Sequence, residues 1–289
     1  ALGFEGVTIT DALDMRALPQ GDAQVLDTIA ARRAGVDLLL TAIDAEASAR
    51  IEGGLEHAAR RGLLDPDDLE RSAVRVDRLR AHLGAFPDPA PSVVGSAAHL
   101  ALARELAQRS ITLVRDEAGL LPLRLSPGQR ILAVMPAPRN LTPADTSSTV
   151  SPGLAAALRT VHPSVDEIVT SHPPTDREIA GVREAASRVD VVVVGTIAAS
   201  LEPAPSPQAA LVRSALEVGV PTVTVALRTP WDLLAYPETG THLATYGLLP
   251  PTIEALARAL IGEVVPEGRL PVRLGPVVRP EAGAAYRSG

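Results

Sequence analysis

Four consecutive valines, Val191 to Val194, constrain the fold more than any other stretch of this chain. A strand with one face in water alternates apolar and polar residues, whereas a central parallel strand is covered on both faces and is apolar throughout. Other β-rich runs lie at 111–114, 131–135, 165–169, 222–226 and 243–246, and helical stretches alternate with them at 152–159, 176–187, 207–218 and 252–261. This alternation predicts an α/β fold, an open and mostly parallel three-layer sandwich.

The segment 86–95 divides the chain into two predicted domains. Three prolines lie within residues 87–91, and such a composition favours an extended, semi-rigid connection. We therefore expect a first domain over 1–85, a linker over 86–95 and a second domain over 96–289, which opens with a helix at 97–110. At 289 residues and 46% hydrophobic composition, the chain is long enough for two packed cores.

Residues 1–85 have the pattern of two βα units. The β-branched run 7–10 predicts a buried strand, and the apolar run that follows a sharp turn at Gly35 and ends at Leu40 predicts a second strand. The remaining pattern predicts helices at about 21–34, 45–61 and 66–83, the last of them capped by Asp65 with Pro66 at its first position.

Asp11 lies at the carboxyl end of the predicted strand 7–10. In parallel α/β barrels, the side chains that do chemistry project from the carboxyl ends of the strands. A carboxylate there can act as a nucleophile, a base or a metal ligand. Aspartate is also a favoured N-cap, and the local sequence alone favours a cap on the following helix over a chemical role.

The segment around Asp11 changes that balance, because it resembles the nucleophile segment of family 3 glycoside hydrolases. Residues 3–15 read Gly-Phe-Glu-Gly-Val-Thr-Ile-Thr-Asp-Ala-Leu-Asp-Met and are similar to the β-N-acetylglucosaminidase branch of that family. In the family, the first Asp after the strand attacks the sugar, and Asp11 is the matching position. The β-glucosidase branch usually has Trp directly after this Asp, so Ala12 favours the hexosaminidase branch.

Later segments resemble the second domain of the same family, in the same order along the chain. The matching stretches lie at 103–105, 110–115, 120–123, 191–196, 228–232 and 262–272. The resemblance implies that residues 1–85 hold the last two βα units of a TIM-type (β/α)8 barrel. A complete barrel needs about 250 residues. We therefore expect this chain, which begins inside a motif and without Met, to be the C-terminal part of a two-domain member.

The resemblance implies retaining hydrolysis of β-linked N-acetylglucosamine, from glycans such as peptidoglycan fragments. Asp11 would form a glycosyl-enzyme, which water then cleaves with help from an acid/base group. In this branch the acid/base is a His on an earlier barrel loop, in a Lys-His-Phe-Pro-Gly-His-Gly-Asp type segment, and no such segment occurs in this sequence. We therefore expect the activity in the intact parent protein and little or none in this chain alone.

Four more residues are candidate substrate contacts. Met15 closes the motif around the proposed nucleophile. Asp145, Ser147 and Ser148 lie in a loop of the second domain where strand ends would face a crevice, and open α/β sheets bind ligands in such crevices. Ser and Thr also favour turns and helix caps, so a purely structural role is the alternative for this loop.

Other polar residues near these segments are assigned structural roles. We expect Asp14 to start or face the following helix rather than line a pocket, and Glu5 to lie on the surface. Asp232, two residues after Pro230, is expected to cap or orient a turn. Gln208 is expected to open a helix and to be structural.

Composition and missing motifs exclude several classes of function. A net charge of −7 argues against non-specific nucleic-acid binding, and no apolar run approaches the roughly 18 residues that cross a bilayer. The chain has no cysteine, and its six histidines form no ligand cluster, so no metal site is expected. No dinucleotide-binding or Walker motif is present, and no cofactor is expected. A cytoplasmic or secreted location and the oligomeric state remain open.

Two other hypotheses are compatible with the same residues. One keeps the family and changes the sugar, to that of a β-glucosidase or β-xylosidase. The other is non-enzymatic, with the second domain acting as a carbohydrate-binding or assembly module. A stand-alone flavodoxin-like domain is disfavoured, because nothing in the sequence supplies a phosphate-binding nest.

Overall fold

The computed structural model of the protein describes residues 3–15, 17–41, 44–142 and 144–275. The chain divides into two compact units, Ala1–Pro91 and Ser92–Gly289, called unit 1 and unit 2 below. The division falls inside the Pro-rich segment 86–95. Among the described residues, no helix combines the length and the apolar character that a membrane span requires.

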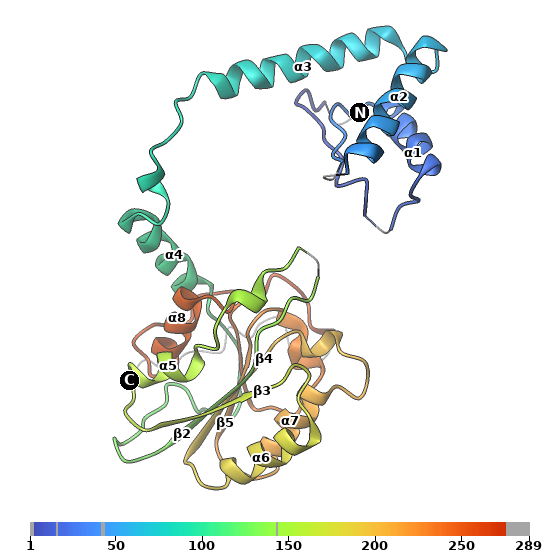
Figure 1. Cartoon of the computed structure of the whole chain (residues 1–289). Coiled ribbons are helices and arrows are strands. Elements are labelled where there is room, and N and C mark those ends of the chain that lie inside the picture. The colour runs from blue at the N-terminus through green and yellow to red at the C-terminus, as the bar shows by residue number, and fades with distance from the viewer. Residues whose placement is uncertain (1–2, 16, 42–43, 143, 276–289) are drawn as a thin grey trace. The chain divides into compact units, whose positions relative to one another are not determined.

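The described residues of unit 1 form three helices that agree with the predicted ones to within one residue at each end. They are α1 (Asp22–Arg33), α2 (Ala45–Arg60) and α3 (Pro66–Gly84), which Figure 1 shows in blue to cyan. The predicted cap of α3 is confirmed, because the Asp65 carboxylate accepts the N–H of Asp67 and Pro66 takes the first helical position. Asp44 caps α2 in the same way.

Within the described part of unit 1, the two predicted strands pair in parallel through one bridge, between Ile9 and Leu38. Leu38 donates its N–H to the Thr8 carbonyl at 2.9 Å, and Thr10 donates to the Leu38 carbonyl at 3.0 Å. The expectation that 7–10 forms a buried strand is wrong, since Ile9 is 59% exposed. Among the described residues this segment has a strand partner on one side only, so the bridge does not extend into a covered sheet.

A buried carboxylate ties these strands to α3. The Asp37 side chain is 1% exposed and accepts hydrogen bonds from the N–H and hydroxyl of Thr8, from the Ser72 hydroxyl and from the Arg75 guanidinium. Burial alone would raise the pKa of Asp37, but the bonds from Arg75, Thr8 and Ser72 outweigh it and hold this pKa well below its usual range. The carboxylate therefore stays ionised and joins both strands to one helix.

Unit 2 is built on one six-stranded sheet. Its strands are β1 (Thr112–Asp116), β2 (Ile131–Pro136), β3 (Val165–Thr170), β4 (Val191–Thr196), β5 (Thr222–Ala226) and β6 (Thr241–Ala244). Their spatial order is β1-β6-β5-β4-β2-β3, with β1 antiparallel to β6 and all other neighbours parallel. The sheet is therefore mixed and mostly parallel, as the apolar runs predict.

Helices cover both faces of this sheet. They are α4 (Ala97–Ser110), α5 (Leu154–Arg159), α6 (Asp176–Ala186), α7 (Pro207–Leu216) and α8 (Pro250–Leu260). Val191 and Val193 pack with α5 and α8 on one face, and Val192 and Val194 pack with α6 and α7 on the other. Figure 1 shows the two helix layers on either side of the strands. The four valines are each at most 4% exposed, because alternate side chains of the strand enter two separate cores.

The last strand of unit 2 and the predicted linker differ from the expectations. The last strand spans Thr241–Ala244 and not 243–246, because its polar residues Thr241 and His242 pair with β1. The predicted linker also contains a short 3-10 helix, η1 (Pro91–Val93), so it is not extended throughout.

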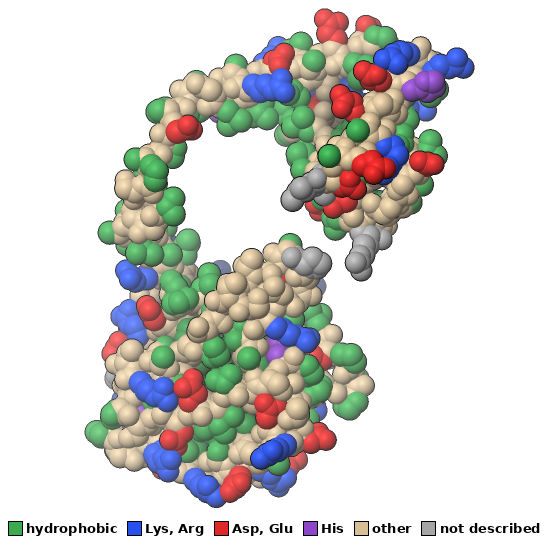
Figure 2. Space-filling model, in the orientation of Figure 1, with side chains coloured by type: hydrophobic (Ala, Val, Ile, Leu, Met, Phe, Trp, Pro, Cys, Tyr) green, Lys and Arg blue, Asp and Glu red, His purple; other side chains and the backbone are tan. Residues whose placement is uncertain are grey.

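Figure 2 shows hydrophobic side chains at the surface along α3, where Leu83 is exposed.

Candidate functional site

Asp11 directly follows the bridged segment of unit 1, and its side chain is exposed. One carboxylate oxygen accepts the N–H of Ala12 at 2.7 Å, and within the described residues the other oxygen has no hydrogen-bond partner. The helix that follows, α1, begins at Asp22 and has Gly21 at its N-cap position. The interpretation of Asp11 as a helix cap is therefore wrong.

The turn after Asp11 is held by groups that the sequence did not reveal. Leu13 is buried and donates its N–H to the carbonyl of Leu40 at 2.9 Å, so the chain stays beside the end of the second strand segment. The amide of Gln24, a buried side chain on α1, donates to the Leu13 carbonyl at 2.8 Å. Gln20 donates to the carbonyls of the same turn. This frame fixes the backbone next to Asp11 while the carboxylate remains accessible.

The other candidate residues of this segment are exposed. Asp14 lies in a turn ahead of α1, Met15 is 47% exposed and Glu5 lies before the strand segment. Asp14 therefore neither starts nor belongs to a helix, which corrects the expectation for this residue. The substrate-binding role of Met15 stays a prediction.

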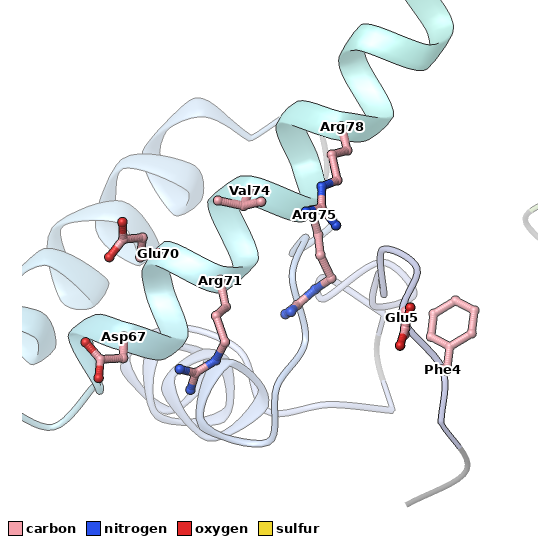
Figure 3. Close-up of a pocket in the computed structure, with 8 residues that line it drawn as sticks. All are labelled: Phe4, Glu5, Asp67, Glu70, Arg71, Val74, Arg75 and Arg78. Atoms are coloured by element: carbon pink, nitrogen blue, oxygen red, sulfur yellow. The ribbon is translucent and has the colours of Figure 1, made fainter.

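A cavity in unit 1 lies at the opposite end of the strand segment from Asp11. It measures about 660 Å³ and runs between Phe4 and Glu5 on one side and the Arg71, Arg75 and Arg78 row of α3 on the other (Figure 3). Phe4 and Glu5 precede the strand segment, whereas Asp11 follows it. Because chemistry in parallel α/β barrels occurs at the carboxyl ends of strands, this cavity is not the candidate catalytic site.

In unit 2, the loop after β2 is organised by Asp145. One carboxylate oxygen accepts the N–H and hydroxyl of Ser147 at 2.9 and 2.6 Å, and the other accepts the Leu141 N–H at 2.8 Å and an ion pair from Arg228. The bonds from Leu141, Ser147 and Arg228 hold the pKa of Asp145 well below its usual range. The carboxylate is thus ionised and occupied by donors of this chain.

These contacts show that the three candidate residues of the loop have different structural roles. Asp145 has four protein donors and acts as the anchor, while Ser147 belongs to η2 (Ser147–Thr149) and bonds both Asp145 and Arg228. Ser148 is exposed, and its backbone N–H donates to the side chain of Asn140 at 2.8 Å. Arg228 follows β5 and lies 83 residues away from Asp145 in sequence, so no local pattern indicates the pair. A sugar contact by any of the three residues stays a prediction.

A second buried carboxylate, Asp232, lies on η4 (Pro230–Leu234). Asp232 is fully buried and accepts hydrogen bonds from the hydroxyls of Thr196 and Thr229 at 2.7 and 2.8 Å, and from Ser200 of η3 (Ala199–Leu201). Burial raises the pKa of Asp232. The expected turn-orienting role of this residue is confirmed, since it joins the turns that follow β4 and β5.

Gln208 also has the expected structural role. It is the second residue of α7, and its side-chain amide accepts the N–H of Ile197 at 2.8 Å and donates to the carbonyl of Ile197 at 2.9 Å.

Within the residues that the structure describes, His, Asp and Glu side chains form no group of three that could hold a metal ion.

The chain matches the glycosyl hydrolase family 3 C-terminal domain over residues 111–286. It is 30% identical over 295 residues to a β-N-acetylglucosaminidase/β-glucosidase of Cellulomonas fimi and 28% identical over 310 residues to β-hexosaminidase A of Pseudoalteromonas piscicida. In each case the match covers 94% of this chain and 50% of the relative. The chain therefore spans about half the length of these relatives.

Solved structures give the same assignment. A family 3 β-N-acetylglucosaminidase from Paenibacillus sp. str. FPU-7 matches with a TM-score of 0.80 at 25% identity, over 94% of this chain and 52% of that one. A fungal multi-domain family 3 β-N-acetylglucosaminidase matches with a TM-score of 0.78 at 26% identity, over 94% of this chain and 31% of that one. The fold is thus that of an α/β glycosidase domain. The chain belongs to glycosyl hydrolase family 3.

Proposed function

We propose that this chain is part of a retaining β-N-acetylglucosaminidase in which Asp11 is the nucleophile. The observation that carries the proposal is the position of Asp11, which directly follows a parallel-bridged strand segment and presents one carboxylate oxygen with no partner among the described residues. Its place within the family-like motif of residues 3–15, and the names of the relatives, support the same assignment.

In the proposed mechanism the free oxygen of Asp11 attacks the anomeric carbon of a β-linked N-acetylglucosamine and displaces the leaving group. Water then hydrolyses the glycosyl-enzyme with net retention of configuration. The exposed carboxylate is suited to this step because a nucleophile must be reachable by the substrate. We propose that residues 1–85 form the last two βα units of a TIM-type barrel. The rest of that barrel, in the parent protein, would supply the acid/base. Muropeptide-like fragments of cell-wall glycans are the proposed natural substrates.

The test is covalent labelling of the full-length protein. A mechanism-based fluorosugar that forms a slowly hydrolysed glycosyl-enzyme should add one sugar mass to the peptide that contains Asp11. In the same protein, Asp11→Asn should lower kcat by about a thousandfold or more and abolish labelling. Asp14→Asn is the matched control, because Asp14 lies three residues on and is also exposed. Wild-type turnover in the Asp11→Asn protein, or labelling at another residue, would remove Asp11 from the mechanism.

A β-glucosidase activity is the second candidate, because the Cellulomonas fimi relative carries both activities in its name. A panel of chromogenic β-glycosides on the full-length protein separates the two. We expect the N-acetylglucosaminide to have the highest kcat/KM, since Ala12 takes the place where the β-glucosidase branch usually has Trp.

A further inference from the structure

The turns after β4 and β5 display apolar side chains on a rigid frame. Trp231 of η4 is 40% exposed, Leu234 of the same turn is 44% exposed, and Leu201 of η3 is 70% exposed. The two turns pack against each other. Trp231 is the only tryptophan of the chain, and it is partly exposed while most large apolar residues of unit 2 are buried.

The frame behind these side chains is the buried carboxylate of Asp232. Its bonds to Thr196, Thr229 and Ser200 connect the end of β4, the end of β5 and the turn that carries Leu201. Enclosing an ionisable group is costly unless it is hydrogen-bonded, and here several hydroxyls satisfy it. The conformation of both turns is therefore fixed by the protein interior and does not depend on the exposed side chains.

Polar groups lie in the loops at the same edge of the sheet as Trp231. Arg228 precedes Trp231 by three residues and bonds Asp145 and Ser147 of the loop after β2. Strands β2, β4 and β5 are parallel, so their following loops share one edge of the sheet. The exposed hydroxyl residue Ser148 lies next to Ser147 on that edge. One edge thus combines an aromatic face, a guanidinium and hydroxyl groups.

We propose that this edge is a saccharide-binding subsite with Trp231 as the stacking platform. A pyranose ring has an apolar face of C–H groups and a rim of hydroxyls, so it matches an aromatic ring flanked by a few placed polar groups. The exposed apolar side chains Leu201, Trp231 and Leu234 lie on two short turns that pack against each other, so the platform they form consists of three residues. Stable protein partners bury roughly 800 Å² per side, so a sugar suits this surface better than a protein does.

The ligand must sit on this outer edge and not inside the sheet. Between β2, β4 and α7 the structure leaves a cavity of only about 10 Å³, lined by Pro136, Thr196 and Gln208 among others. Such a space holds at most about one water molecule. The ligand identity rests on the proposed function: we expect a chain of β-linked N-acetylglucosamine, bound by unit 2 independently of hydrolysis.

The experiment uses the intrinsic fluorescence of the 289-residue chain, because its single tryptophan is the proposed platform. We expect N,N′-diacetylchitobiose to shift the Trp231 emission to shorter wavelength and to protect it from acrylamide quenching, both with saturation in the millimolar range. By calorimetry, Trp231→Ala should weaken binding about tenfold or more, and Trp231→Phe should weaken it less. Leu106→Ala, which removes another exposed apolar side chain on α4, should leave affinity unchanged.

Three outcomes would overturn the subsite. The first is an emission spectrum that the sugar does not change, which decides the question even if Trp231→Ala fails to fold. The second is binding that Trp231→Ala leaves intact but Asp11→Asn removes, which would place the sugar in unit 1 and leave the proposed function standing. The third is concentration-dependent self-association that Trp231→Ala abolishes and the sugar does not affect, which would make the platform a protein contact.

Discussion

Unit 1 joins its two strand segments through a single parallel bridge, whereas unit 2 encloses six strands between two helix layers. In unit 2, the apolar side chains of the central strands are almost wholly buried by helices of the same unit. In unit 1, the apolar side chains Phe4, Ile9 and Leu40 are exposed, and the segment is held by the polar contacts of Asp37. The sheet of unit 2 is therefore stabilised by a hydrophobic core, whereas the strand segments of unit 1 are held by a few directional hydrogen bonds.

The largest expected effect tests the core of unit 2. Leu256 of α8 is fully buried, so Leu256→Ala should lower the free energy of unfolding by about 3 kcal/mol through lost burial and a new cavity. Ile9→Ala, the matched change in unit 1, should cost less than about 1 kcal/mol because Ile9 is exposed. Urea titration followed by Trp231 fluorescence measures the Leu256→Ala variant, and hydrogen exchange at the Leu38 amide measures Ile9→Ala. Equal losses in the two variants would contradict this difference between the units.

The next effect tests the polar anchor of unit 1. Asp37→Ala leaves the Arg75 guanidinium and the Thr8 and Ser72 groups without their acceptor, so it should destabilise unit 1 by about 2 kcal/mol. Hydrogen exchange at the Leu38 amide should accelerate accordingly, while the transition followed by Trp231 stays in place. Asp77→Ala serves as the control. It removes a carboxylate from the exposed Asp77–Arg80 ion pair on α3, the helix that also carries Ser72 and Arg75. Unchanged exchange in Asp37→Ala would contradict the anchor.

The contrast between the units also explains what the sequence could predict. The helices of both units, and five strands of the sheet, follow from local patterns, because a covered strand must be apolar and a helix start needs a cap. Val191 to Val194 indicated a doubly covered strand without any knowledge of its partners. The strand 241–244 was misplaced because Thr241 and His242 are polar, and their burial depends on β1, which lies more than 100 residues earlier.

The candidate site was less predictable than the fold. The motif around Asp11 predicts a nucleophile, and that role stays a prediction, whereas the local preference for a helix cap is wrong because Gly21 takes the N-cap position of α1. The sequence predicts that Asp145 lies in a loop, but it does not predict its ion pair with Arg228. The two residues follow two different strands, so no local pattern connects them. Trp231 carries no sequence signal for exposure, since an isolated Trp in an apolar segment is usually buried. Long-range pairing and exposure decide these roles, and local patterns do not contain them.

The third effect is a pH dependence confined to unit 2. His242 on β6 is fully buried, and desolvation together with the nearby Arg115 charge lowers its pKa to about 3 from an ordinary value near 6.5. The unfolded chain binds a proton at His242 below pH 6.5, and the folded chain does not. The contribution of His242 to the free energy of unfolding is therefore complete above pH 6.5 and is lost as the pH falls toward 3.

Between pH 7 and pH 5, His242 should therefore reduce the free energy of unfolding of unit 2 by about 2 kcal/mol. His242→Gln should remove that part of the pH dependence, whereas His82→Gln, at an exposed histidine of unit 1, should keep it. Urea titrations at both pH values, followed by Trp231 fluorescence, measure the difference. If the His242→Gln chain loses as much stability as the wild type, the histidine is not the titrating group.

The smallest expected effect concerns surface ion pairs, which occur on helices of both units. Glu56 pairs with Arg60 on α2, and Glu105 pairs with Arg109 on α4, each with both side chains more than half exposed. Water and salt screen such pairs, so Glu56→Gln and Glu105→Gln should each change the free energy of unfolding by less than about 0.5 kcal/mol. Hydrogen exchange in α2 measures the first variant, and Trp231 fluorescence the second. A loss in Glu56→Gln as large as that in Asp37→Ala would mean that unit 1 depends on its surface charges in general, and that the buried anchor is not what distinguishes it from unit 2.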